Sequence, residues 1–221
     1  MQIAIVGYGN VGSALAEAFR AAGHRVTFAV APDRRDRAAA AIDARPALAD
    51  VALADPDQAV AVADLVVLAI PFGALDATLA PRAGALSGKV VVDATNPVGP
   101  GLVHGLGSQR SGAEHVADLL PGSRVAKAFS VYGFENLAAA PKGPGGLRPA
   151  MPYAADDPVA REVVAGLIAE LGWEPFDAGG LAAAVDLEHL ALLWVRHVRM
   201  GGRSPQLVWA ALRAEGGLAD R

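Results

Sequence analysis

The sequence predicts an α/β fold built on a doubly wound, mainly parallel sheet. Short apolar runs that suit buried parallel strands alternate with longer segments whose apolar residues recur at helical spacing. The first run, Gln2 to Val6, is followed by a glycine-rich turn, a helical pattern and a second apolar run, which is the order of a βαβ unit. Because crossovers between parallel strands are right-handed, continued alternation places helices on both faces of one sheet.

The composition limits the classes of function that the chain can serve. Its 221 residues are 53% hydrophobic and 19% charged, which is typical of a globular protein. The net charge of -4 gives no general attraction to nucleic acid or anionic membrane, and no apolar run is long enough to span a membrane. The absence of cysteine excludes disulfides and cysteine-ligated metal, and no secretory signal is visible. We expect a cytoplasmic protein that binds no metal, nucleic acid or membrane.

The first part of the chain supplies most of the predicted sheet. Apolar residues from Val11 to Ala22 predict a helix that ends at Gly23, a suitable C-cap. A strand follows at Arg25 to Ala31 and ends at Pro32. Further elements are expected as strands at Asp64 to Ile70, Lys89 to Ala94 and Ser123 to Ala128, a weaker strand at Val51 to Leu53, and a helix at Phe72 to Ala85.

Two stretches have the composition of connecting segments. Asn96 to Gly112 has many glycines and no apolar period, so we expect a long loop over one sheet edge. Ser111, with Glu114 three residues later, predicts a capping box for a helix that runs to Leu120. Ala138 to Ala150 is expected to be a second flexible connection.

The remaining residues predict a small C-terminal extension of helices and strands. Strands are expected at Met151 to Ala154 and Trp173 to Asp177, around a helix at Pro158 to Leu171. A final helix after Gly180 is apolar nearly all round, so we expect it to be buried in the fold or in a homodimer formed through the C-terminal helices, with Ser204 to Leu212 beside it. We expect a single domain over 1–221, with its core at 1–130 and the extension 150–221 packed on it.

The first turn contains glycines at a recognisable spacing. Gly7, Gly9 and Gly12 follow a strand and open a helix, as in the G-x-G-x-x-G fingerprint of the Rossmann dinucleotide-binding fold. There the first glycine permits the tight turn, the second lets the backbone approach a pyrophosphate, and the third allows close helix packing. The alternative is a purely structural turn, but the strand before and the helix after favour dinucleotide binding.

The end of the second strand bears on the choice of dinucleotide. NAD sites usually place an acidic residue about 20 positions after the glycines, where this chain has Val30, Ala31 and Pro32. The following segment "DRRDR" supplies Arg34 and Arg35, and a guanidinium suits a 2'-phosphate. The alternative is that these arginines bind no phosphate and only form the charged, solvent-exposed start of a helix. NADP(H) is therefore favoured, with NAD(H) left open.

Several motifs together resemble one family over nearly the whole chain. They are "GYGNVG", "GHRVTF", "AIPF", "SGAEHVADLLPGSRVAKAF", "AADD" and "FDAGGL". With these motifs the chain resembles the NADP oxidoreductases related to the deazaflavin (coenzyme F-420) dependent NADP reductases, which share their Rossmann domain with the cytoplasmic part of membrane ferric reductases. The pairing of "AKAF" with "DAGGL" and an apolar final helix is more specific than the glycine motif alone.

The resemblance implies roles for particular positions. Gly9, Asn10 and Val11 would contact the pyrophosphate, Ile70 and Pro71 would line the nicotinamide side, and Asn96 would lie near the ribose and carboxamide, unless it only begins a turn with Pro97. Relatives often hold the 2'-phosphate with Ser-Arg where this chain has Val30 and Ala31. Arg35 is therefore the first candidate for that contact and Arg34 the second.

The substrate side is less defined. The candidates are Ser130, Tyr132, Gly179, Gly180 and Leu181. Relatives usually have polar residues and an arginine where this chain has the apolar "AAAV", and many have Asn where Ser130 stands. These departures leave open whether the hydride acceptor is the polyanionic deazaflavin.

No acid–base set is evident, and catalytic residues stay unassigned. Hydride transfer between stacked heterocycles depends mainly on proximity and alignment. Tyr132 is interpreted either as a proton donor or as a core aromatic, Glu188 as a helix surface charge, and most histidines as ordinary surface or helix residues.

The sequence thus supports three functional hypotheses. The first is an NADP(H)-dependent oxidoreductase that exchanges hydride with a deazaflavin or flavin-like molecule. The second is a small C=N or C=O reductase, which would need a proton donor near the hydride path. The third is a dinucleotide-binding sensor or assembly subunit without turnover.

Overall fold

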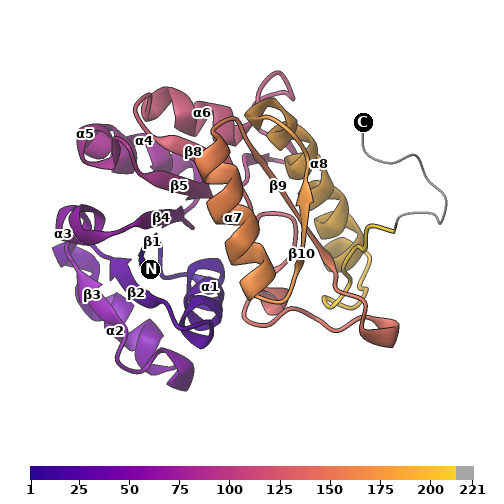
Figure 1. The fold of residues 1–221 in the computed structure, drawn as a ribbon, viewed down its shortest axis with the longest axis horizontal. Coiled ribbons are helices and arrows are strands. Elements are labelled where there is room, and N and C mark those ends of the chain that lie inside the picture. Colours follow the sequence, from indigo (N-terminus) through magenta and orange to yellow (C-terminus); the bar gives the residue numbers. More distant parts are fainter. Residues whose placement is uncertain (213–221) are drawn as a thin grey trace.

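The computed structural model describes residues 1–212, and in this part of the chain one large sheet is flanked by helices (Figure 1). Its strands are β1 Gln2–Val6, β2 Arg25–Ala29, β3 Ala52–Ala54, β4 Leu65–Leu68, β5 Val90–Asp93, β8 Arg124–Lys127, β9 Ala150–Ala155 and β10 Glu174–Asp177. They pair in the order β10-β9-β8-β5-β4-β1-β2-β3. All pairs are parallel except β8 with β9, which confirms the doubly wound, mainly parallel fold.

The helices connect these strands. They are α1 Asn10–Ala21, α2 Arg35–Asp43, α3 Pro56–Val62, α4 Leu75–Leu79, α5 Ala83–Leu86, α6 Gly112–Leu119, α7 Pro158–Glu170 and α8 Ala184–Val195. In Figure 1, α4, α5 and α6 gather along the upper edge, while α7 crosses in front of the β8 and β9 end of the sheet. The capping box at α6 is confirmed, because the Ser111 hydroxyl accepts from the backbone amide of Glu114 and the Glu114 carboxylate accepts from the amide of Ser111.

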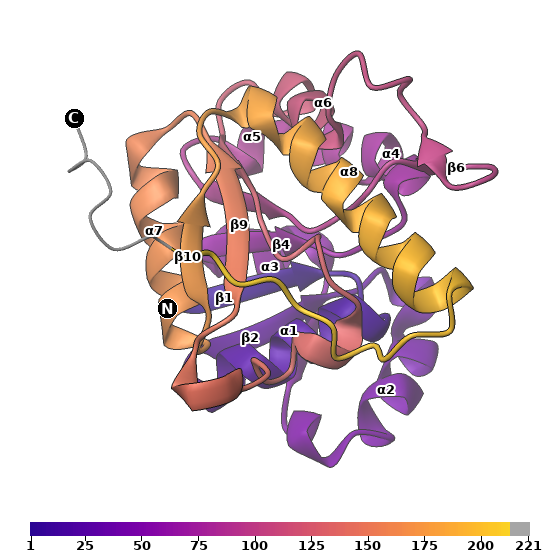
Figure 2. The same cartoon turned by 90° about the vertical axis from the view of Figure 1, so that its right-hand side faces the viewer.

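The sheet twists strongly along its width. In Figure 2, β1 and β2 run across the view whereas β9 and β10 run up and down it, as the right-handed twist of successive strands requires. The central strands are almost fully buried, and their Val, Ile and Leu side chains form the core with Phe19 and Phe28. The carboxyl ends of the parallel strands β1, β4, β5 and β8 therefore form one edge, where the loops meet.

Two predicted segments differ from expectation. The helix expected over Phe72 to Ala85 is broken into α4, α5 and short 3-10 turns, because Pro81 has no amide to donate. The long loop expected at Asn96 to Gly112 contains a small antiparallel hairpin, β6 Val98–Gly99 with β7 Val103–His104. This hairpin is separate from the large sheet.

The extension after residue 150 continues the sheet through β9 and β10 and ends in α8. A π-helical turn, Arg196–Met200, lengthens α8. The helix is not buried all round, because half of Leu193 is exposed. Residues 204–212 lie along their own chain: the Trp194 indole donates to the carbonyl of Leu207, and the amide of Ala150 donates to the carbonyl of Trp209. The expected domain bounds that reach residue 221 include 213–221, outside the described residues.

Within residues 1–212, no helix has the length and apolar composition needed to cross a membrane.

Candidate functional site

The glycine turn between β1 and α1 is shaped by close backbone contacts. Gly7 has φ of 115°, and a Cβ there would lie 2.3 Å from the carbonyl oxygen of Ala69. A Cβ at Gly12 would lie 1.9 Å from the carbonyl oxygen of Gly7. A Cβ at Gly9 would meet nothing within 4 Å. The fold itself therefore requires glycine at positions 7 and 12, whereas the space above Gly9 is open at the N-terminus of α1, where backbone amides favour phosphate.

Two hollows flank this turn. A groove of about 450 Å³ follows the ends of β1, β2 and β4 and is lined by Gly7, Ala31, Arg34, Ile70 and Pro71, among others. A smaller hollow of about 260 Å³ is lined by Tyr8, Gly9, Asn10, Ser13, Arg37, Ala41 and Arg45. Arg34 and Arg37 thus each line a hollow beside the turn. Arg35, the first candidate for the 2'-phosphate, is exposed at the start of α2 and is not among the described residues that line either hollow.

The other end of the site lies where β5 and β8 end. A hollow of about 510 Å³ is lined by Pro71, Phe72, Asn96, Pro97 and neighbouring hairpin residues. Pro71 lines both this hollow and the 450 Å³ groove, so the two adjoin. The Asn96 side-chain amide donates to the carbonyl of Ser130 at 2.8 Å, which joins the two strand ends.

Buried polar atoms without partners gather at these strand ends. Among the described residues, the Oγ1 atom of Thr95, the Oδ1 atom of Asn96 and the Oγ atom of Ser130 have no hydrogen-bond partner. A buried polar atom without a partner costs about 1–3 kcal/mol. Phe129, directly before Ser130, has a left-handed φ of 58°, which costs a non-glycine residue about 1–3 kcal/mol. This clustering of unsatisfied groups and backbone strain makes the strand ends a candidate ligand-binding position.

A buried ionic network lies directly beneath the same strand ends. The Lys127 ammonium contacts the Asp93 carboxylate at 2.9 Å, the Glu188 carboxylate at 2.8 Å and the Thr95 carbonyl at 2.5 Å. The His104 Nε2 atom lies 2.8 Å from the other Glu188 oxygen. We call Asp93, Lys127, Glu188 and His104 the buried quartet. The interpretation of Glu188 as a surface charge is wrong, since only 1% of the residue is exposed.

Sequence reasoning misjudged two members of the quartet, Glu188 and His104, and made no prediction for Asp93 or Lys127. Glu188 lies on the face of α8 that also buries Ala184, Ala191 and Leu192, so its position among apolar residues was the available signal. His104, expected to be an ordinary surface or helix residue, is buried in the hairpin.

The substrate candidates do not come together. Tyr132 is buried against Trp173, its hydroxyl donates to the carbonyl of Ala150, and the hydroxyl oxygen accepts from the amide of Trp209. Burial raises the pKa of Tyr132 to about 12.

Gly179, Gly180 and Leu181 lie elsewhere. The amide of Leu181 donates to Asp156, just after β9, and the carbonyl of Gly179 accepts from the amide of Ala155. Tyr132 contacts the opposite end of β9, at Ala150, and six residues of strand span about 17 Å. Ser130 lies beside Asn96 through their hydrogen bond. Residues 179–181 instead lie at the carboxyl end of β9, remote from Tyr132.

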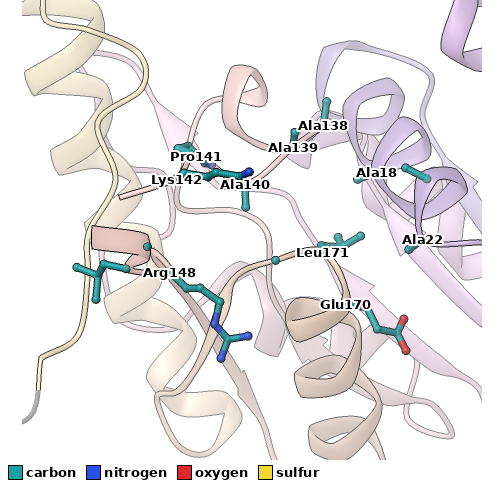
Figure 3. Close-up of a pocket in the computed structure, with 14 residues that line it drawn as sticks. Ala18, Ala22, Ala138, Ala139, Ala140, Pro141, Lys142, Arg148, Glu170 and Leu171 are labelled. Carbon is teal, nitrogen blue, oxygen red and sulfur yellow. The ribbon is translucent and has the colours of Figure 1, made fainter. Parts of the chain in front are cut away.

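A further hollow, of about 620 Å³, is separate from this site. Figure 3 shows it between the last turn of α1, the end of α7 and the 138–148 segment, with Ala18, Ala140 and Leu171 around it. A helix of twelve residues is about 18 Å long, so the far end of α1 separates this hollow from the glycine turn. We do not assign it to the cofactor.

The parallel sheet, the glycine turn and the adjoining hollows define a dinucleotide-binding protein of the Rossmann class. Residues 2–97 match the family model "NADP oxidoreductase coenzyme F420-dependent". The match covers the first part of the chain only, and it confirms the resemblance inferred from the motifs.

Individual relatives agree with the family. A crystal structure from Arthrobacter sp. FB24, described provisionally as an F420-dependent NADP reductase, is 26% identical with a TM-score of 0.82 and covers 96% of this chain and 100% of that chain. A hypothetical protein from Sinorhizobium meliloti is 28% identical with a TM-score of 0.71 over 96% of each chain. Metalloreductase STEAP3 of Rattus norvegicus is 31% identical over 147 residues, which are 66% of this chain and 28% of the metalloreductase.

More distant structures share the fold. An imine reductase from Streptomyces aurantiacus is 20% identical with a TM-score of 0.64, covering 91% of this chain and 64% of that one. The matching family model and the names of the Arthrobacter and Rattus relatives all describe reductases or oxidoreductases, which supports the class of NADP-dependent oxidoreductase for this chain.

Proposed function

We propose that the protein is an NADPH-dependent oxidoreductase that transfers hydride to a deazaflavin or flavin-like acceptor. The observation on which this rests most directly is the row of adjoining hollows that begins at the open glycine turn and ends at Asn96, next to the unpartnered polar atoms of Thr95 and Ser130. A bound dinucleotide needs these groups in this order along the site: backbone amides for its pyrophosphate, then polar groups for its nicotinamide end.

The adenosine end of the proposed site favours NADPH. The 450 Å³ groove contains Arg34, and the adjacent 260 Å³ hollow contains Arg37. Guanidinium groups bind phosphate with two parallel hydrogen bonds, and the competing cations are occupied: Arg45 binds Glu17 at 2.9 Å and Arg82 binds Asp57 at 2.7 Å. We therefore propose Arg34, with Arg37, as the 2'-phosphate contacts and move Arg35 to second place.

The nicotinamide end matches an amide ligand. The free Oδ1 atom of Asn96 is an acceptor for a carboxamide N–H, and the Thr95 and Ser130 hydroxyls can donate or accept. Ile70 and Pro71 supply apolar contact between the two ends of the site. Bound NADPH would supply the hydride itself, and the protein would orient the ring and exclude water.

The acceptor is inferred from the relatives. The Arthrobacter structure matches this chain over nearly its whole length, and its description is an F420-dependent NADP reductase. The apolar "AAAV" segment, Ala182 to Val185, departs from relatives that bind a polyanion. A flavin without the deazaflavin's polyanionic tail is therefore included among the proposed acceptors.

The imine or carbonyl reductase hypothesis has lost its candidate proton donor. The Tyr132 hydroxyl already donates one hydrogen bond and accepts another inside the core, so it is not available to a substrate. The likeness to imine reductases concerns the fold alone. The sensor hypothesis remains as one outcome of the test below.

We also propose that the protein acts in the cytoplasm as a homodimer and that residues 150–221 form one domain with the core. Exposed Leu193 and Met200 near the end of the C-terminal helix support a contact between copies. Size-exclusion chromatography with light scattering tests this: a single 22.5 kDa species would contradict the dimer.

The proposed function is tested by calorimetric titration with NADPH and NADH, followed by anaerobic turnover assays with deazaflavin, flavins and ferric chelates. We expect tighter NADPH binding and turnover with deazaflavin or flavin. Turnover with ferric chelates alone would favour metalloreductase chemistry. Tight cofactor binding without turnover would favour the sensor hypothesis. If neither cofactor binds, the glycine turn has a structural role only.

A further inference from the structure

The hydrogen bonds of the buried quartet assign a protonation state to each member. Lys127 directs three contacts to Asp93, Glu188 and the Thr95 carbonyl, and an ammonium has three N–H donors. Asp93 also accepts from the amide of Thr95 at 2.9 Å. Every partner of the Asp93 carboxylate is therefore a donor, which requires the ionised acid.

Glu188 and His104 are fixed by the same reasoning. The Glu188 oxygens accept from Lys127, from His104 and from the amide of Gly112, at 2.9 and 3.1 Å. The Nδ1 atom of His104 faces the amides of Leu106 and Ser108 at 3.2 and 3.1 Å, so it must be an acceptor without a proton. The proton of His104 is then on Nε2, directed at Glu188, and the imidazole is neutral.

The quartet consequently has a net negative charge. One ammonium faces two carboxylates and a neutral imidazole, and the exposed fractions of all four residues are between 0 and 6%. The amide of Gly112 belongs to the first turn of α6, so the positive end of that helix stabilises the Glu188 carboxylate without adding a full charge. In a buried position, solvent screens this charge weakly.

The charge lies next to the proposed nicotinamide end. Lys127 binds the carbonyl of Thr95, and Thr95, Asn96 and Ser130 are the residues with unpartnered polar atoms. Oxidation of NADPH to NADP+ releases a hydride, meaning a proton with two electrons, to the flavin-like acceptor and leaves one positive charge on the nicotinamide ring. On the basis of the proposed function, we propose that the buried quartet stabilises that positive charge, so that the bound cofactor favours its oxidised form and NADPH is the hydride donor.

The test compares binding of the two cofactor forms in charge-changing variants. The measured quantity is the ratio of the Kd for NADP+ to the Kd for NADPH, by calorimetry at pH 8. The variants E188Q and D93N each remove one negative charge. The variant H104Q replaces a neutral side chain by another that still donates toward Glu188, and it is the matched control for loss of packing.

The ratio separates an electrostatic role from a structural one. A distorted site weakens both cofactor forms together and leaves the ratio unchanged, whereas a lost charge weakens NADP+ more. At an effective dielectric constant of about 20, loss of one unit charge near the ring changes affinity by roughly tenfold. We expect E188Q and D93N to raise the ratio roughly tenfold and H104Q to leave it within twofold. Circular dichroism identifies any variant that fails to fold, in which case the other charge-removing variant decides.

Two results would overturn the proposal. The first is an unchanged ratio in a folded E188Q or D93N variant, and the second is an equal rise in H104Q. If the wild-type protein binds neither NADP+ nor NADPH, the proposed function fails instead, which keeps the two outcomes distinct.

Discussion

The space above Gly9 makes the most specific prediction about the glycine turn. In Gly9→Ala, the added methyl group meets no atom within 4 Å, and φ of -71° with ψ of -171° suits alanine. Gly9 is the N-cap of α1, where alanine is somewhat less favourable, so we expect a stability loss below about 1 kcal/mol. The same methyl group would occupy the position from which a pyrophosphate approaches the backbone.

The expected effect on binding is large by comparison. A hydrogen bond to a charged group contributes about 1.5–3 kcal/mol, so loss of one backbone contact to phosphate weakens binding at least tenfold. Calorimetric titration with NADPH and thermal denaturation measure the two effects separately. Gly166→Ala is the matched control: its Cβ also meets nothing, and a glycine-to-alanine change inside α7 should stabilise the helix without affecting NADPH binding.

A contrasting variant completes the experiment. Gly12→Ala places Cβ 1.9 Å from the carbonyl oxygen of Gly7, so we expect it to lower the melting temperature before binding can be assessed. If Gly9→Ala bound NADPH as tightly as the wild-type protein, the proposed approach of the pyrophosphate to the Gly9 backbone would be refuted.

Three further predictions follow from the site and its surroundings. Arg34→Ala should weaken NADPH binding about 10- to 100-fold and leave NADH binding unchanged, with a smaller selective loss in Arg35→Ala; equal losses for both cofactors in Arg34→Ala would exclude a phosphate contact. Ser111→Ala should lower the free energy of unfolding by about 1–2 kcal/mol in urea denaturation, because the capping box of α6 is lost, and an unchanged midpoint would contradict this. Burial raises the pKa of Tyr132 from 10.0 to about 12, so its contribution to stability is complete below pH 10 and is lost as the pH rises through 12; the tyrosinate absorbance titration should include a step near pH 12 that is absent in Tyr132→Phe.

Local features of the site were predictable from the sequence. The glycine turn, the flanking strand and helix, and the α6 capping box depend on residues a few positions apart, so spacing alone determines them. The exposed arginines at the start of α2 were a harder case. Arg34 ends a 3-10 turn and Arg35 begins α2, so the local backbone turn between these neighbours, rather than their spacing, decides which one lines the groove.

The buried quartet could not be predicted in the same way. His104 and Glu188 are 84 positions apart, and Lys127 and Asp93 come from two other strands, so only the sheet order and the position of α8 bring them together. For Asp93, Lys127 and Glu188, the available signal was a charged residue in an apolar element. That signal indicates burial, but it does not identify the partner.

The central claim is direct hydride transfer from NADPH. The most direct test uses NADPH deuterated at the transferred position of its nicotinamide ring, with a deazaflavin acceptor whose receiving atom is carbon and so retains the isotope. Mass spectrometry of the reduced acceptor should show one deuterium per NADPH oxidised. NADPH oxidation that leaves the acceptor without deuterium, or the absence of any oxidation with deazaflavin and flavins alike, would contradict the proposed function.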